Sequence, residues 1–292
     1  MSKERVILYD ASRTYAEYVT PRTLLAEQLH CQYDDLACFR AASVDNIIAA
    51  QTKVDAMLIS LEIVLMFEPW VPVIDNILVH GQLYDTVRNL TFPTKPLIIG
   101  TLTEEAIVLV DSNLNETMSA SLYGEIVLGI FQTKAVKVLE RFPPSGAGDQ
   151  RTLFSRIITQ WLFSCTTRIF ARQAANYSYV YDYPYDFDGW GNWTFCNGHV
   201  CHGVEIPYIM QSKWNNFTDA GRRVSQNMGT YWTNFAKTQD PNQPLPVALS
   251  WPKANTVNEP YLHIKDPLDV QENYLKSDCD FWDTIGYKRE LF

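Results

Sequence analysis

The chain has 292 residues, of which 47% are hydrophobic and 20% are charged, a composition typical of a globular protein with a substantial buried core. Its net charge of −9, without any run of basic residues, argues against binding to nucleic acid or to an anionic membrane. The longest apolar stretch, residues 56–67, is too short to span a bilayer and contains Glu62, so we interpret it as buried core.

Strand and helix patterns follow one another from the N-terminus. The apolar run at residues 6–10 predicts a buried strand, and the next segment predicts a helix with Thr20 as N-cap and Pro21 at its first position. Runs rich in β-branched and aromatic residues predict further strands at 95–100 and 178–183. This order of strands and helices is typical of an α/β fold.

Apolar residues at intervals of three or four predict helices at 126–138, 154–169 and 220–235. The last of these has Thr218 as N-cap and ends before Asp240-Pro241. We interpret all three stripes as core packing and not as cofactor sites.

The chain contains neither an internal repeat nor a low-complexity linker. Residues 144–148, rich in proline and glycine, predict a short loop between helices. We therefore expect one domain over residues 1–292.

Five Asn-x-Ser/Thr sequences indicate N-glycosylation and a secretory route: Asn89, Asn115, Asn176, Asn192 and Asn216. Residues 1–6 nevertheless contain no apolar signal segment. Because the sequons indicate secretion and the N-terminus does not, we expect this chain to be the later part of a longer secreted protein.

Two of the six cysteines and two of the five histidines lie close together, as Cys196, His199, Cys201 and His202. A structural zinc site normally draws its second ligand pair from a distant segment, so a metal site is disfavoured here, and no cofactor is expected. An even number of cysteines is expected for disulfides in an oxidising compartment, although six cysteines allow fifteen connectivities.

His202 differs from the other histidines. Gly203 and Glu205 follow it and Pro207 comes next, which predicts a loop that leads into a short helical turn. An imidazole on such a loop can reach an active site. No acidic or nucleophilic motif surrounds the other histidines outside this loop, which we interpret as structural or surface residues: His30, His80 and His263.

The sequence CHGVEIPYIM, residues 201–210, resembles the segment around the catalytic histidine of the type-B carboxylesterases and cholinesterases, a family of α/β-hydrolases. Other segments resemble the family in the family's own order: residues 25–41, 67–75, 97–109, 231–242, 251–252 and 279–283. The Cys196/Cys201 pair before His-Gly most resembles the cholinesterase-like proteins of amoebae. The resemblance implies a mostly parallel sheet flanked by helices.

The resemblance also implies residue roles. His202 matches the general base and Glu105 the carboxylate that orients it, while the neighbouring Glu104 is interpreted as a solvated loop residue. Ala106 replaces a family glycine, and Gln160 stands where the family often has an acid, so local packing is expected to differ. Three disulfides are implied: Cys31–Cys38, Cys165–Cys279 and, for the two remaining cysteines, Cys196–Cys201.

The family's nucleophile lies on a Gly-x-Ser-x-Gly elbow, and its oxyanion hole comes from a glycine-rich segment further upstream. This sequence contains no Gly-x-Ser-x-Gly, and residues 6–12 resemble the strand that follows the nucleophile helix. We therefore expect the C-terminal portion of an α/β-hydrolase fold, without its N-terminal strands and nucleophile elbow, and without ester hydrolysis of its own.

Three functions remain open from the sequence. The first is the C-terminal part of a secreted serine carboxylesterase, whose full-length form would act on a small carboxylic ester. The second is a cholinesterase-like adhesion or structural protein without catalysis, and the third is a degenerate fragment. The presence of both Glu105 and His202 favours the first, because an adhesion protein has no chemical need for them.

Overall fold

The computed structural model describes the chain except for residues 1–14, 60–69, 71, 90–94, 147 and 288–292. The strand expected at residues 6–10 lies outside the described residues. Within them, the helices are α1 (Tyr15–Leu29), α2 (Leu36–Ala41), α3 (Val44–Ile59), α4 (Leu83–Arg88), α5 (Ile107–Asn113), α6 (Ala120–Phe131), α7 (Ala135–Arg141), α8 (Arg151–Ile158), α9 (Cys165–Ala174), α10 (Ile206–Met210), α11 (Asp219–Thr238) and α12 (Lys276–Ile285).

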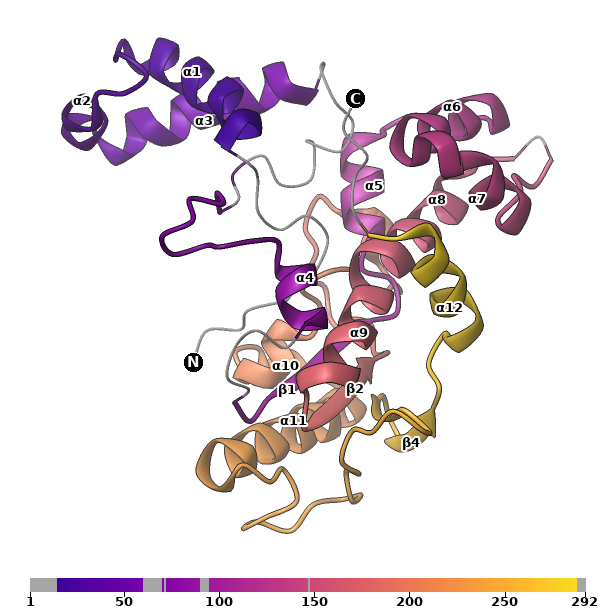
Figure 1. Ribbon diagram of the computed structural model, residues 1–292. Helices are drawn as coiled ribbons and strands as arrows, with labels where there is room; N and C mark the ends of the chain where they lie inside the picture. Colours follow the sequence, from indigo (N-terminus) through magenta and orange to yellow (C-terminus); the bar gives the residue numbers. More distant parts are fainter. Residues whose placement is uncertain (1–14, 60–69, 71, 90–94, 147, 288–292) are drawn as a thin grey trace.

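A four-stranded sheet in the order β1-β2-β3-β4 lies at the centre of the fold (Figure 1). Its strands are β1 (Ile98–Leu102), β2 (Tyr177–Tyr181), β3 (Pro260–Ile264) and β4 (Asp269–Glu272). The first three run parallel, and β4 pairs antiparallel with β3. The strands expected at 95–100 and 178–183 are thus confirmed as β1 and β2, with shifted boundaries, whereas β3 and β4 were not expected from the sequence.

Helices cover both faces of the sheet, as expected for parallel strands. On one face, Phe170 of α9 and Val87 of α4 pack against Ile99. On the other face, Val224 of α11 belongs to a cluster with Leu262 of β3. A further apolar core joins helices α5 to α8 with α12. Helices α1 to α3 form a separate group, at the upper left of Figure 1.

The helix expected at 220–235 is confirmed as α11. The Thr218 hydroxyl accepts a hydrogen bond from the Gly221 amide at 3.2 Å and caps the N-terminus. At the other end, Gln239 takes a left-handed conformation, with φ 64°, one residue before Asp240.

Two other helix predictions need correction. The stripe at 126–138 is divided into α6 and α7, because Gln132 has a positive φ of 46° and starts a short 3-10 turn, η2 (Gln132–Lys134). Thr20-Pro21 does not start a helix: α1 begins at Tyr15, and Pro21 takes an interior position, where it lacks an amide for helical hydrogen bonding. The loop expected around 144–148 does lie between α7 and α8.

The stripe at 154–169 forms a continuous helical run with an unexpected centre. Between α8 and α9 the chain makes a π-helical segment, η3 (Thr159–Ser164), which we call the π turn. All six of its residues are buried. Gln160 in this turn accepts a hydrogen bond from Trp282 Nε1 at 3.0 Å and donates one to Asp278 at 2.8 Å, so the π turn is tied to α12.

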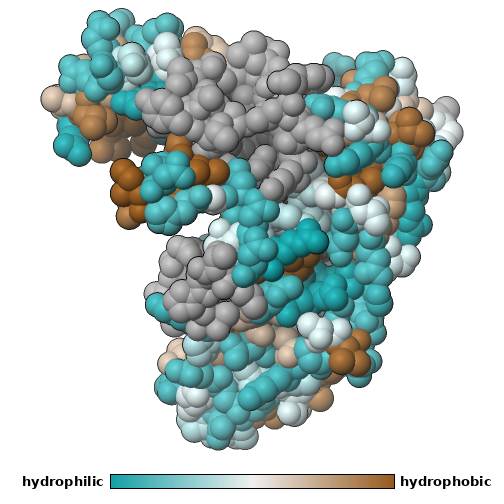
Figure 2. Space-filling model, in the orientation of Figure 1, coloured by the Kyte–Doolittle hydropathy of each residue, from teal (hydrophilic) through white to brown (hydrophobic). Residues whose placement is uncertain are grey.

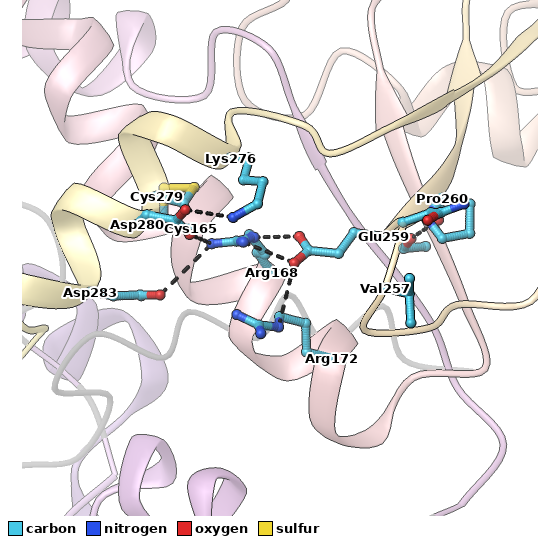
Figure 3. A network of polar contacts seen from close by, with 12 residues as sticks. Cys165, Arg168, Arg172, Val257, Glu259, Pro260, Lys276, Cys279, Asp280 and Asp283 are labelled. Atoms are coloured by element: carbon cyan, nitrogen blue, oxygen red, sulfur yellow. Dashed lines mark hydrogen bonds and ion pairs between the residues drawn. A yellow bond between two sulfur atoms is a disulfide. The ribbon is translucent and has the colours of Figure 1, made fainter.

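All six cysteines form disulfides, and the pairs are those that the family resemblance implied. Cys165–Cys279 joins α9 to α12. Beside it, the Arg168 side chain, 8% exposed, donates to Glu259 at 2.5 and 2.8 Å and to Asp280 at 2.9 Å (Figure 3). One buried guanidinium therefore holds α9, α12 and the residue before β3 together.

Hydrophilic side chains predominate on the face drawn in Figure 2, and the hydrophobic ones form several separate groups. No helix in the described parts of the chain combines the length and the apolar character needed to cross a membrane.

Candidate active site

Glu105 and His202, which are 97 residues apart in the chain, are in direct contact. The Glu105 Oε2 atom lies 2.6 Å from His202 Nδ1. The glutamate side chain is 3% exposed and the histidine side chain 32% exposed. A buried carboxylate thus holds one nitrogen of an imidazole that is partly open to solvent.

The end of β1 orients the Glu105 carboxylate. The chain turns after Leu102, and Glu105 Oε1 accepts hydrogen bonds from the Leu102 amide at 2.9 Å and from the Thr101 hydroxyl at 3.4 Å. Because both donors belong to strand β1, they fix one oxygen and leave the other directed at His202. This is the carboxyl edge of the parallel strands, where α/β proteins bind their ligands.

The loop that presents His202 is closed by the Cys196–Cys201 disulfide. Both cysteines are fully buried and pack against Val108 of α5, the helix that follows Glu105. The loop then leads into α10, as the sequence predicted for His202. The disulfide therefore ties the base to the same segment of chain that carries the acid.

Glu104 is not the solvated residue expected from the sequence. Its Oε2 accepts the Val200 amide at 2.7 Å, and its Oε1 lies 3.0 Å from His199 Nδ1. The closed loop presents an amide that needs an acceptor, and Glu104 supplies it. Two adjacent glutamates thus bind the histidine loop at two points, and only one of them is buried.

The cysteine and histidine cluster is not arranged for a metal ion. The sulfurs of Cys196 and Cys201 are bonded to each other and so are not thiolate ligands. Among the described residues there is no group of three or more His, Cys, Asp and Glu side chains placed to hold a metal.

His263, which we interpreted as a structural or surface residue, lies between two carboxylates. Its Nε2 is 3.1 Å from Asp182, and its Nδ1 is 3.0 Å from Asp269. The hydrogen bond from His263 lowers the pKa of Asp182. Asp182 was not predicted as a neighbour because it is 81 residues away in the sequence. Asp269 was not predicted because it lies on β4, a strand that was not expected.

The five predicted glycosylation sites differ in access. Asn89, Asn115, Asn192 and Asn216 are exposed. Asn176 is half-buried, and its side-chain oxygen accepts a hydrogen bond from the Leu97 amide at 2.9 Å.

Phe163 was not predicted as a site residue, because the apolar stripe at 154–169 indicates only core packing. Its ring lies 5.5 Å from the His202 ring, at 57° between planes. No periodicity marks this contact, because the π turn changes the direction of the Phe163 side chain within the helical run.

The chain is similar to known proteins over nearly all of its length. A model of the carboxylesterase family matches residues 13–282. The chain is 28% identical over 275 residues to the Crystal protein of Dictyostelium discoideum, covering 90% of this chain and 50% of that protein. It is 26% identical over 279 residues to the cAMP-regulated D2 protein of the same organism, covering 91% of this chain and 51% of that protein.

The fold is that of solved esterases. A PNB esterase superposes with a TM-score of 0.72 at 15% identity, over 93% of this chain and 55% of the esterase chain. The chain thus spans about half the length of the curated relatives it matches. With the family match extending over nearly all of its length, the chain belongs to the carboxylesterase family.

Proposed function

We propose that Glu105 and His202 are the acid and the base of a Ser-Glu-His triad in a carboxylic ester hydrolase. The 2.6 Å contact between the buried Glu105 carboxylate and His202 Nδ1 carries this proposal. A carboxylate at Nδ1 keeps that nitrogen protonated and makes Nε2 the nitrogen that accepts a proton in the reaction.

The proposed chemistry assigns one task to each residue. His202 Nε2 takes the proton of a serine hydroxyl while the serine oxygen attacks the ester carbonyl, and then gives that proton to the departing alkoxide. Glu105 stays ionised and stabilises the imidazolium. The same steps with water in place of the serine release the carboxylic acid.

No serine of this chain is proposed as the nucleophile, because the sequence contains no Gly-x-Ser-x-Gly. We propose that the serine and the oxyanion donors lie in a part of the full-length protein outside this sequence. The 292-residue chain alone then hydrolyses p-nitrophenyl acetate no faster than buffer. Turnover that disappears in His202→Ala would contradict this part of the proposal.

Labelling of the native protein tests the triad itself. A fluorophosphonate probe, which forms a covalent bond with activated serines, is applied to an extract of the source cells and of their medium. We expect the labelled fraction to contain peptides of this chain, such as residues 157–168, on a longer polypeptide with the probe on an upstream serine. Recovery of those peptides only from unlabelled protein would instead support a non-catalytic, cholinesterase-like protein.

We also propose that the protein passes through the secretory pathway. Three disulfides and four sequons with an exposed asparagine support this route. Treatment of the native protein with peptide-N-glycosidase should lower its mass, with sites converted to Asp at exposed sequons such as Asn115 and Asn192. A native protein without any such conversion contradicts the proposal.

A further inference from the structure

The π turn, Thr159–Ser164, lies beside the Glu105–His202 pair and is not used by the proposed chemistry. In an α-helix, with 3.6 residues per turn, residue i+5 lies about 140° around the axis from residue i. In a π-helix the hydrogen bond runs from i to i+5, so those two residues lie above one another. The π geometry therefore brings Thr159, Phe163 and Ser164 to the same side of the helix.

Phe163 contacts the pair directly, and Thr159 and Ser164 contact chain neighbours of Glu105. The Thr159 hydroxyl accepts the Ala106 amide at 2.9 Å, directly after Glu105. Phe163 packs its ring against that of His202, with 5.5 Å between centroids. The Ser164 hydroxyl lies 3.4 Å from the Thr101 hydroxyl, which in turn donates to Glu105 Oε1.

These contacts act on the acid through residues on both sides of it in the chain. Thr159 binds the amide of Ala106, directly after Glu105, and Ser164 contacts the hydroxyl of Thr101, four residues before it. Either hydroxyl can donate in the contact between Ser164 and Thr101, and with Ser164 as the donor the Thr101 hydrogen is left for Glu105. Because Thr101, Thr159 and Ser164 are each 3% exposed or less, water does not replace a lost partner easily.

We infer that the π turn is a positioning element for the Glu105–His202 pair, with Thr159 and Ser164 acting through the acid and Phe163 acting on the base. This inference rests on the proposed function for its catalytic meaning. The positioning itself is a property of the 292-residue chain and is measurable without ester hydrolysis.

The experiment follows the proton on His202 Nδ1 by NMR in the 292-residue chain labelled with ¹⁵N-histidine. His202→Gln identifies its signal among those of the five histidines. We expect Thr159→Val and Ser164→Ala each to speed exchange of this proton with water by about fivefold, the effect of weakening one buried hydrogen bond. The conservative variants Thr159→Ser and Ser164→Thr should restore slow exchange.

Ser155→Ala is the matched control. Ser155 is buried in α8, one turn before the π turn, and its hydroxyl has no hydrogen-bond partner among the described residues. Its replacement removes a buried hydroxyl from the same helical run and should leave the His202 proton unchanged. A purely structural role of the π turn predicts lower unfolding midpoints for Thr159→Val and Ser164→Ala with unchanged His202 exchange.

Unchanged exchange in both Thr159→Val and Ser164→Ala would overturn the inference, as would equal acceleration in Ser155→Ala. Failure of the fluorophosphonate labelling would remove the proposed esterase activity and leave this result standing. The two proposals therefore fail separately.

Discussion

The His202 imidazole and the Glu105 carboxylate meet through a 2.6 Å contact in which only the histidine reaches solvent. The carboxylate also accepts hydrogen bonds from the Leu102 amide and the Thr101 hydroxyl of β1. It is therefore held by donors from one strand and by the histidine of the loop closed by Cys196–Cys201. This arrangement makes the acid more important for the local structure than its neighbour Glu104.

Glu105→Gln should therefore cost more stability than Glu104→Gln. The amide retains the shape of Glu105 but weakens hydrogen bonds made to a buried charge, for an expected loss of about 2 kcal/mol in the free energy of unfolding. Glu104 is 36% exposed, and its replacement should cost less than about 1 kcal/mol. Urea unfolding at pH 7 measures both values, and equal losses would contradict the prediction.

The disulfides Cys165–Cys279 and Cys196–Cys201 should contribute unequally to stability. They join residues 114 and 5 positions apart, and longer closed loops lose more entropy in the unfolded chain. Removing the first by paired Cys→Ala changes should cost about 5 kcal/mol and removing the second about 2 kcal/mol.

Removal of Cys196–Cys201 should also change hydrogen exchange locally, in the loop that presents His202. Amide hydrogen exchange at Val200 is expected to accelerate in the Cys196→Ala, Cys201→Ala protein and to stay slow in the Cys165→Ala, Cys279→Ala protein under folding conditions. A larger loss of stability on removing Cys196–Cys201 than on removing Cys165–Cys279 would contradict the prediction and would show that native contacts outweigh loop entropy.

Gly221→Ala should destabilise the protein. A Cβ at Gly221 would lie about 2.1 Å from the Asp186 carboxylate oxygen, and that carboxylate also binds Thr218 at the start of α11. The displaced carboxylate leaves the Thr218 amide without its acceptor, for an expected loss of about 2 kcal/mol.

Gly124→Ala is the matched control in α6, because a Cβ there meets nothing within 4 Å. Alanine is favoured over glycine inside a helix, so we expect this variant to gain about 1 kcal/mol. Thermal unfolding of the two variants should shift in opposite directions, and a loss in both would contradict the argument.

Asp149 should contribute a pH-dependent part of the stability. Its hydrogen bonds, chiefly the one from Arg151, lower its pKa to about 2. Because the folded pKa is below the unfolded value of 3.8, the contribution is fully present above about pH 4 and is lost as the pH falls towards 2.

The Asp149→Asn variant checks this. We expect it to be about 1 kcal/mol less stable at pH 7, a value reduced for solvent screening, and to approach the parent protein near pH 2. Urea unfolding at several pH values gives the difference in the free energy of unfolding between the two proteins. A difference that increases as the pH falls would contradict the prediction.

Strong local patterns predicted much of the fold. The apolar stripe of α11 and its Thr218 cap agree with the structure because the signals lie in neighbouring residues. The helix start at Thr20-Pro21 and the unbroken helix at 126–138 were wrong, because an interior proline and the positive φ of Gln132 depend on the surrounding packing and not on local preference. The organisation of residues 1–292 as one domain stays a prediction.

The site was predictable only where a family motif marks it. Glu105 and His202 were paired through a resemblance, and the structure brings them into contact. Thr159 and Ser164 carried no signal, since a hydroxyl in a buried helix has no typical spacing and a π turn does not follow the 3.6-residue period. The contact of Glu104 with Val200 depends on a loop closed by a disulfide, which no local pattern describes.

The Cys165–Cys279 bond closes a covalent ring that contains His202 but not Glu105. A protease cut inside the ring and before His202, for example between β2 and Cys196, leaves both pieces joined by this disulfide, so acid and base remain on one molecule without reductant. A single cut between α5 and α8 separates Glu105 from the ring and leaves the pair held by packing alone. On a non-reducing gel the protein cut inside the ring therefore runs as one species, and the protein cut between α5 and α8 runs as two.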